Sequence, residues 1–332
     1  MRVLRMYRHE FDSVTEARHF LSKRRVTDVP VVAGSDSFRF EGDLIRIENV
    51  AHPISRGFLQ AFCEYMRPRI PVKFATEIPA DLFQEVGNRL MRHHDVKGKK
   101  LVVRIEQWDE QGAPWAWASA IVTEEYRFID HERILDAASL AGADKGCVLL
   151  TDKILRVTSA SRPFSVKVNG HRDEFRCGFE IINSESRFYQ ISVARYLLRL
   201  VCTNGMVVRL PGEMAFKHRH VIEPTRALTR LSEVLGHGPT WATADVAFQQ
   251  RLETLATSPA DGTWLRLRQA EMGSVIGAKT AQAAMENLEP SRPGEPPTQF
   301  DVMNVMARVA RELKDVDRRR TLEIHAGNLI WR

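Results

Sequence analysis

The sequence predicts an α+β protein, with a central mixed β-sheet made of hairpins and helices and a helical C-terminal part. Segments of the first two thirds alternate apolar and polar residues with the period of two that is typical of strands. Turn dipeptides such as Asn169–Gly170 separate these segments. After Pro224 the apolar residues recur every three to four positions instead, which predicts a series of helices between residues 226 and 314.

The first hundred residues contain both patterns. Ser55 precedes an apolar stripe that stops before Pro68, and a second stripe follows Pro79, which are typical limits of helices. The expected elements are a short amphipathic helix over 13–25, short strands over 28–50 around Gly34 and Gly42, a helix from Ser55, and a helix after Pro79.

The middle of the chain is rich in strand patterns. Strands are expected over 100–106, 115–122, 146–150, 154–158, 164–168 and 175–182, with a hairpin loop at 109–112 and a helix at 130–140 for which Asp130 is the N-cap. We also predict a helix over 193–202, because Ser192 is a good N-cap and Asn204–Gly205 a good C-terminal stop. C-terminal helices are expected over 226–235, 243–256, 264–272, 278–288 and 300–314.

Length and composition limit the classes of protein. A chain of 332 residues is long enough for about two domains, and we divide it into an N-terminal region 1–50, a central α+β domain 51–222 and a helical region 223–332 with a proline-rich linker near 289–299. The apolar runs are far shorter than the ~20 residues of a membrane span, and the four cysteines form no CxxC pair. We therefore expect a soluble cytoplasmic protein with reduced thiols and no contact with membranes.

Positive charge is concentrated in one part of the chain. The net charge is +6, whereas residues 153–219 alone contain twelve Lys and Arg against five Asp and Glu, a formal charge of +7. Such a segment either attracts polyanions or forms a solvated face, and charge alone does not separate the two.

Motifs of common enzymes are absent from the sequence. It contains no GxGxxG after a strand, no GxxxxGK[ST], no GxSxG and no HExxH. We therefore expect a non-enzymatic protein without a cofactor.

A set of histidines and a set of acidic residues are the candidates for catalysis or metal binding. His93 and His94 precede Asp95, and His218 and His220 flank Arg219. The last two would share one face of a strand, but two histidines are half a metal site, so we expect solvated histidines and no bound metal. The acidic set lacks the lysine that often follows the last carboxylate of a nuclease, so we expect these residues to pair with arginines: Asp173, Glu174, Glu180 and Glu185.

The third set alternates basic and aromatic residues. Single-stranded nucleic acid binding needs cations for phosphates and flat rings for bases. Phe179 and Phe188 in this stretch are also suited to a protein core. We predict that the nucleic-acid-binding residues are Arg172, Arg176, Arg187, Tyr189, Arg195, Tyr196, Arg199 and Arg209, extended by Lys97, Lys99 and Lys100.

Several of these segments resemble a known family. Residues 179–185 (FEIINSE), 199–206 (RLVCTNGM), Arg219–His220 and 123–130 (TEEYRFID) are similar to the phage- and plasmid-associated family of unknown function numbered nine-hundred-thirty-two. The resemblance covers about residues 50–225 and implies a mobile-element or genome-defence setting. A more distant similarity is to Rad-type and Red-beta-type single-strand annealing proteins, which implies a ring-forming protein that holds single-stranded DNA in a basic groove.

Together these observations predict a self-associating, ATP-independent protein that binds single-stranded DNA in an annealing or protection role. The first alternative is a protein-interaction or inhibitor module of a mobile element, acting through its C-terminal helices. The second is a metal-dependent nucleic-acid-processing enzyme that uses His218 or Glu180.

Overall fold

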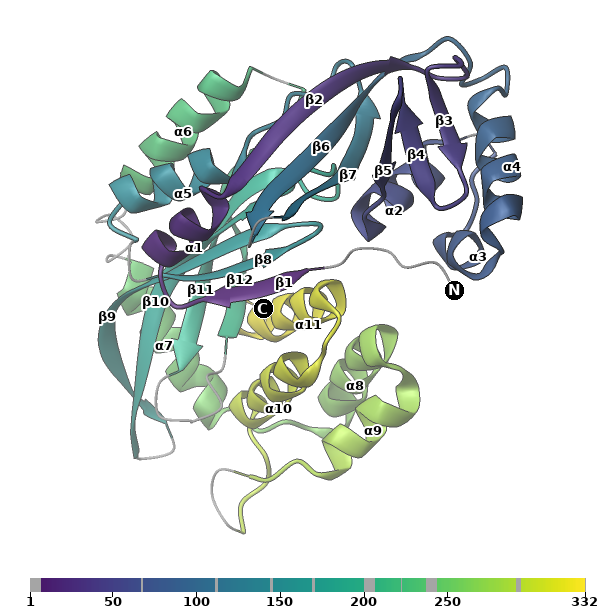
Figure 1. The fold of residues 1–332 in the computed structure, drawn as a ribbon. Helices are drawn as coiled ribbons and strands as arrows, with labels where there is room; N and C mark the ends of the chain where they lie inside the picture. The colour runs from purple at the N-terminus through teal and green to yellow at the C-terminus, as the bar shows by residue number, and fades with distance from the viewer. Residues whose placement is uncertain are drawn as a thin grey trace. The chain divides into compact units, whose positions relative to one another are not determined.

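The computed structural model describes residues 7–66, 68–110, 113–143, 146–168, 171–199, 207–221, 223–236, 244–290 and 294–331. For some strand and helix residues, including 195–199 and 207–218, only the backbone is described. The chain divides into two compact units. Unit 1 contains residues 1–157, 181–192 and 217–233, and unit 2 contains 158–180, 193–216 and 234–332. The expected α+β fold class is confirmed (Figure 1).

Unit 1 holds most of the short strands. In chain order its elements are β1 (Arg8–Phe11), α1 (Val14–Leu21), β2 (Arg24–Val32), β3 (Phe38–Glu41), β4 (Leu44–Ile47), β5 (Val50–Pro53), α2 (Arg56–Tyr65), α3 (Val72–Glu77), α4 (Ala80–Met91), β6 (Lys100–Glu110), β7 (Ala113–Thr123), α5 (His131–Leu140) and β8 (Cys147–Thr151). Strands β2, β6 and β7 form one antiparallel sheet, and β3, β4 and β5 form another.

The second of these sheets packs against helices through aromatic rings. Phe40 on β3 lies between Phe62 of α2 and Phe83 of α4, with ring centroids 4.9 and 4.8 Å away. Gly87 of α4 faces the Phe40 ring, and a Cβ added there would lie 2.6 Å from it. The absence of a side chain at Gly87 thus lets α4 approach the sheet.

Unit 2 contains most of four long strands and the C-terminal helices. These elements are β9 (Leu155–Val168), β10 (His171–Asn183), β11 (Ile191–Arg199), β12 (Val207–His218), α7 (Ala244–Thr257), α8 (Gly262–Ile276), α9 (Ala278–Glu286), α10 (Gln299–Glu312) and α11 (Val316–Trp331), while α6 (Pro224–Gly236) falls mostly in unit 1. The long strands belong to a sheet with the order β1-β8-β9-β10-β11-β12. The core of unit 2 brings Phe175 of β10 against Phe300 of α10, with ring centroids 6.3 Å apart.

One predicted helix is wrong. Residues 191–199 form strand β11, whereas we expected a helix over 193–202. The β-branched Ile191 and Val193 and the aromatic Tyr196 of this segment favour a strand over a helix. Helices α3 and α11 and strand β12 were not predicted. The described part of the chain contains no helix that is long and apolar enough to cross a membrane.

Candidate nucleic-acid interface and buried charge network

The basic residues predicted to bind nucleic acid fall into two groups. Arg172 and Arg176 lie on β10, Arg195 and Arg199 on β11, and Arg209 on β12. These three strands are neighbours in one sheet, and all five positions belong to unit 2. Neighbouring strands are about 4.8 Å apart, so the sheet gathers arginines that the sequence spreads over 38 positions.

The strand conformation of β11 changes the spacing that we expected for its arginines. In a helix, Arg195 and Arg199 would be separated by about 6 Å along the axis, one above the other. In a strand they occupy positions of the same face about 13 Å apart. The described atoms do not include the side chains of Arg172, Arg195, Tyr196, Arg199 and Arg209.

Arg176 shows which face of β10 carries a basic residue. It is half-buried and follows Phe175, which is fully buried against the C-terminal helices. Because successive side chains of a strand point to opposite faces, Arg176 lies on the face that does not pack on Phe300. Phe175 is therefore a core residue and is not available for stacking on a base.

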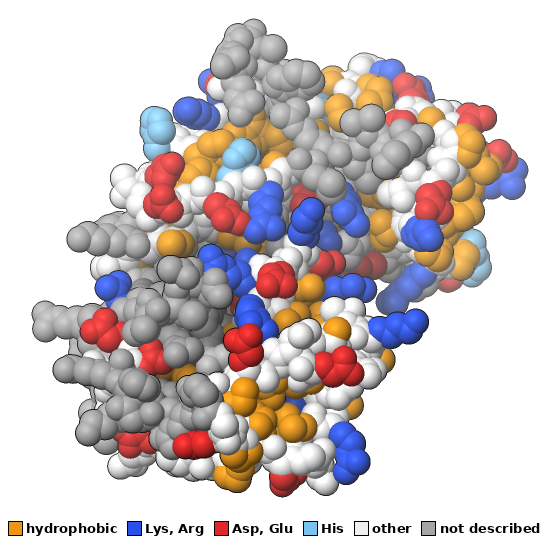
Figure 2. Space-filling view, turned by 90° about the horizontal axis from the view of Figure 1, so that it is seen from below, with side chains coloured by type: hydrophobic (Ala, Val, Ile, Leu, Met, Phe, Trp, Pro, Cys, Tyr) orange, Lys and Arg blue, Asp and Glu red, His pale blue; other side chains and the backbone are white. Residues whose placement is uncertain are grey.

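The remaining predicted residues belong to unit 1 and not to this group. Lys97, Lys99 and Lys100 are exposed, and Lys100 forms an ion pair with Glu124 at 3.8 Å. Arg187, also exposed, lies between β10 and β11 in the left-handed region with a φ of 72°, and Tyr189 is half-buried. On the face drawn in Figure 2, Lys and Arg side chains gather near the middle with Asp and Glu among them.

One of the two histidines that flank Arg219 packs inside unit 1. His220 is buried, its ring stacks on Tyr126 at 4.9 Å, and its Nδ1 donates to the Arg127 carbonyl at 3.2 Å. The side chain of His218 lies outside the described atoms. His220 therefore has a structural role in unit 1.

The acidic set predicted from the sequence does not converge on one site. Asp173 and Glu180 are buried on the part of β10 in unit 2, and Glu174 beside them is exposed. Glu185 lies in unit 1, where it is the centre of a charge network that the sequence analysis did not find.

Two arginines on neighbouring strands of unit 1 hold this buried carboxylate. The Arg24 guanidinium on β2 donates to both Glu185 oxygens, from Nη1 at 2.8 Å and Nη2 at 2.9 Å. Arg104 on β6 places its Nη1 3.2 Å from Glu185 Oε2. The backbone N–H of His131, the first residue of α5, donates to Oε1 at 2.6 Å.

Further carboxylates complete the network around the arginines. Arg104 makes a bidentate pair with Asp28, its partner across the β2–β6 pairing, at 2.8 and 2.9 Å, and also contacts Asp130 at 2.9 Å. Arg24 binds Glu132 at 2.8 Å. Asp130 occupies the expected N-cap position of α5 but makes no capping hydrogen bond from its side chain.

Burial and neighbouring charges shift the pKa values of the network in opposite directions. Burial alone would raise the pKa of Glu185, but Arg24 and Arg104 hold it well below its ordinary value. Burial raises the pKa of Glu106 on β6, and Arg24 opposes that shift without overcoming it. The pKa of His131 falls to about 3, chiefly through burial.

The hydrogen bonds of His131 agree with a neutral ring. Asn183 Nδ2 donates to the Ile129 carbonyl at 2.7 Å and lies 3.1 Å from His131 Nδ1. An amide nitrogen only donates, so Nδ1 accepts and the ring proton is on Nε2. Asn183 and His131 are both buried, and their contact fixes the start of α5 against the end of β10.

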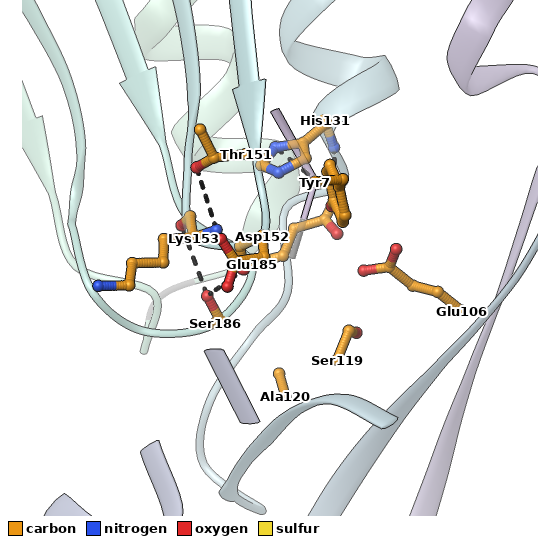
Figure 3. A pocket seen from close by; sticks show the side chains of 10 residues that line it. All are labelled: Tyr7, Glu106, Ser119, Ala120, His131, Thr151, Asp152, Lys153, Glu185 and Ser186. Atoms are coloured by element: carbon orange, nitrogen blue, oxygen red, sulfur yellow. Dashed lines mark hydrogen bonds and ion pairs between the residues drawn. The ribbon is translucent and has the colours of Figure 1, made fainter. Parts of the chain in front are cut away.

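A small pocket adjoins this network in unit 1 (Figure 3). Glu106 and Ser119 lie on one side of it, and Asp152, Glu185 and Ser186 lie on the other. Its empty volume is about 210 Å³ including the open mouth, and it has room for about one water molecule. We therefore assign the network to holding β2, β6 and α5 together, with the pocket suited to water.

No protein-family model, curated protein or solved structure matches this chain. The resemblance of residues 123–130, 179–185 and 199–206 to a phage- and plasmid-associated family therefore stays a prediction.

Proposed function

We propose that the protein binds single-stranded nucleic acid on the sheet formed by β9 to β12 in unit 2, without ATP. The observation that carries this proposal is the placement of Arg172, Arg176, Arg195, Arg199 and Arg209 on three neighbouring strands. An array of cations at sheet spacing matches a flexible phosphate backbone that can follow the sheet surface.

The charge of the chain segment supports the same proposal. Most of the residues 153–219 that carry the formal charge of +7 belong to these four strands. Tyr196 follows Arg195 on β11, so its position belongs to the opposite face of the sheet from Arg195 and Arg199, and we do not propose that it stacks on a base held by them. ATP-independent annealing or protection of single strands, with self-association of the protein, is the role that we propose for this binding.

The test is fluorescence anisotropy of a labelled single-stranded oligonucleotide, with a duplex of the same sequence as the control. Five phosphate contacts on a single strand predict a loss of about 100-fold in affinity between about 50 and 200 mM salt. We expect tighter binding to the single strand than to the duplex. An absence of binding at about 50 mM salt would contradict the proposal, and equal binding to the duplex would remove the single-strand preference.

A further inference from the structure

The turn that follows α4 brings together three side chains that bind transition metals. His93, His94 and Asp95 each offer one ligand atom, and these atoms all lie within 4.8 Å of one another. The described residues contain no other such group of three His, Cys, Asp or Glu residues. Asp95 is the centre of the group, since His93 Nδ1 lies 3.6 Å from its Oδ2 and His94 Nε2 lies 3.3 Å from its Oδ1.

The two separations of 3.6 and 3.3 Å join the histidines to different oxygens of Asp95, and one ligand atom from each residue lies within 4.8 Å of the others, so the side chains move closer together when they bind a tetrahedral ion. Zinc binds imidazole nitrogen and carboxylate oxygen at about 2.0–2.2 Å, and tetrahedral angles then place neighbouring ligand atoms about 3.3–3.5 Å apart. The backbone N–H of Asp95 donates to His93 Nδ1 at 3.4 Å, so this hydrogen bond breaks when the nitrogen binds a metal. Small side-chain rotations are enough to complete the geometry.

The backbone of the turn is fixed, which keeps the three ligands together without a metal. The His93 carbonyl accepts from the N–H groups of Val96 and Lys97 at 2.9 and 2.8 Å. The Val96 side chain is buried in the core of unit 1, and the Gly98 N–H donates to the Ala33 carbonyl at 2.9 Å. Binding therefore orders three side chains, and the chain itself needs no rearrangement.

We propose that His93, His94 and Asp95 form a binding site for Zn²⁺ or a similar divalent transition-metal ion. The His94 side chain is 80% exposed and that of Asp95 52% exposed, so an ion reaches the site from solvent and keeps a fourth position for water. Two nitrogen ligands select against Mg²⁺ and Ca²⁺, which prefer oxygen. The exposed Lys97 and Lys99 repel a cation, so the site is weaker than a structural zinc site.

The test measures zinc binding to the full chain without an affinity tag, in competition with a chromogenic chelator. We expect the wild-type protein to bind one equivalent of Zn²⁺ that His94→Ala and Asp95→Asn each lose. His19→Ala, which removes an exposed histidine from α1, is the matched control and keeps that equivalent. An excess of Mg²⁺ leaves the binding unchanged.

Two further measurements separate this site from other metal-binding groups. Co²⁺ gives visible absorption bands with the wild-type protein and loses them in both ligand variants, while the metal-free variants unfold at the wild-type temperature. A dissociation constant weaker than about 1 mM would overturn the proposal. So would zinc binding that survives His94→Ala and Asp95→Asn, or that is lost in Cys147→Ser, which removes the exposed thiol.

Discussion

Replacing Glu185 by Gln tests whether the buried charge network stabilises unit 1. The substitution keeps the size of the side chain but removes the charge that Arg24 and Arg104 share. It also puts an amide N–H₂ where one carboxylate oxygen accepts from Arg24 at 2.8–2.9 Å. Breaking a buried ion pair on one side costs about 3–5 kcal/mol, because the remaining charges stay buried without their partner.

Glu132→Gln is the matched control, because Glu132 binds the same guanidinium at 2.8 Å from a position that is 34% exposed. Solvent screening limits its contribution to about 1 kcal/mol or less. Urea unfolding of both variants at pH 7 gives the two free energies directly. If Glu185→Gln loses no more stability than Glu132→Gln, the buried charge network does not stabilise unit 1.

Acid sensitivity and packing give two more predictions. The pKa of His131 is about 3 in the folded protein, against an ordinary value of 6.5. The unfolded chain therefore takes up a proton at His131 before the folded protein does. The free energy of unfolding is unaffected by this group above pH 6.5 and falls as the pH is lowered. The loss is about 2 kcal/mol at pH 5, so urea unfolding at pH 7 and 5 should show a smaller difference for His131→Gln than for the wild-type protein. Gly87→Ala should lower stability by about 1–3 kcal/mol, since its Cβ would lie 2.6 Å from Phe40; an unchanged melting temperature would contradict that.

The sequence predicted local structure best where one pattern had a single interpretation. Ser55 caps α2 as expected, with its hydroxyl accepting from the Phe58 N–H at 2.9 Å. The helix predicted over 193–202 was wrong, because Val193, Leu197 and Leu200 fit a helical stripe. Pairing in the sheet decides the conformation of β11 instead. That pairing depends on strands distant in the sequence, which a local pattern does not contain.

The charge network shows a second limit of sequence analysis. Its core joins Arg24, Arg104 and Glu185, which are separated by up to 161 positions, so no spacing rule connects them. One signal was present: Arg104 and Glu106 interrupt the apolar run of β6, and charged residues inside a buried strand need partners. Following that signal would have identified the strand, although not the carboxylate that pairs with it.

The basic residues show the opposite case, because their identity was predicted and their arrangement was not. The alternation of basic and aromatic residues predicted Arg172, Arg195 and Arg199 as nucleic-acid-binding residues. The strand order of β10, β11 and β12 adds that they share one sheet. Lys97 and Lys99 were predicted as part of the same track but belong to the other unit.

If the arginines of this sheet contact phosphates as we propose, the binding of single-stranded oligonucleotide depends on salt to an extent that these residues set. The measurement compares the slope of log K against log salt for wild-type protein and for the double variant Arg195→Ala/Arg199→Ala on a single-stranded oligonucleotide. Each phosphate contact contributes about 0.7 to the slope, so losing two reduces its magnitude by about 1.4. Arg226→Ala/Arg230→Ala removes two exposed arginines of α6 with the same spacing and should leave the slope unchanged. An unaltered slope in a folded Arg195→Ala/Arg199→Ala variant would contradict the account.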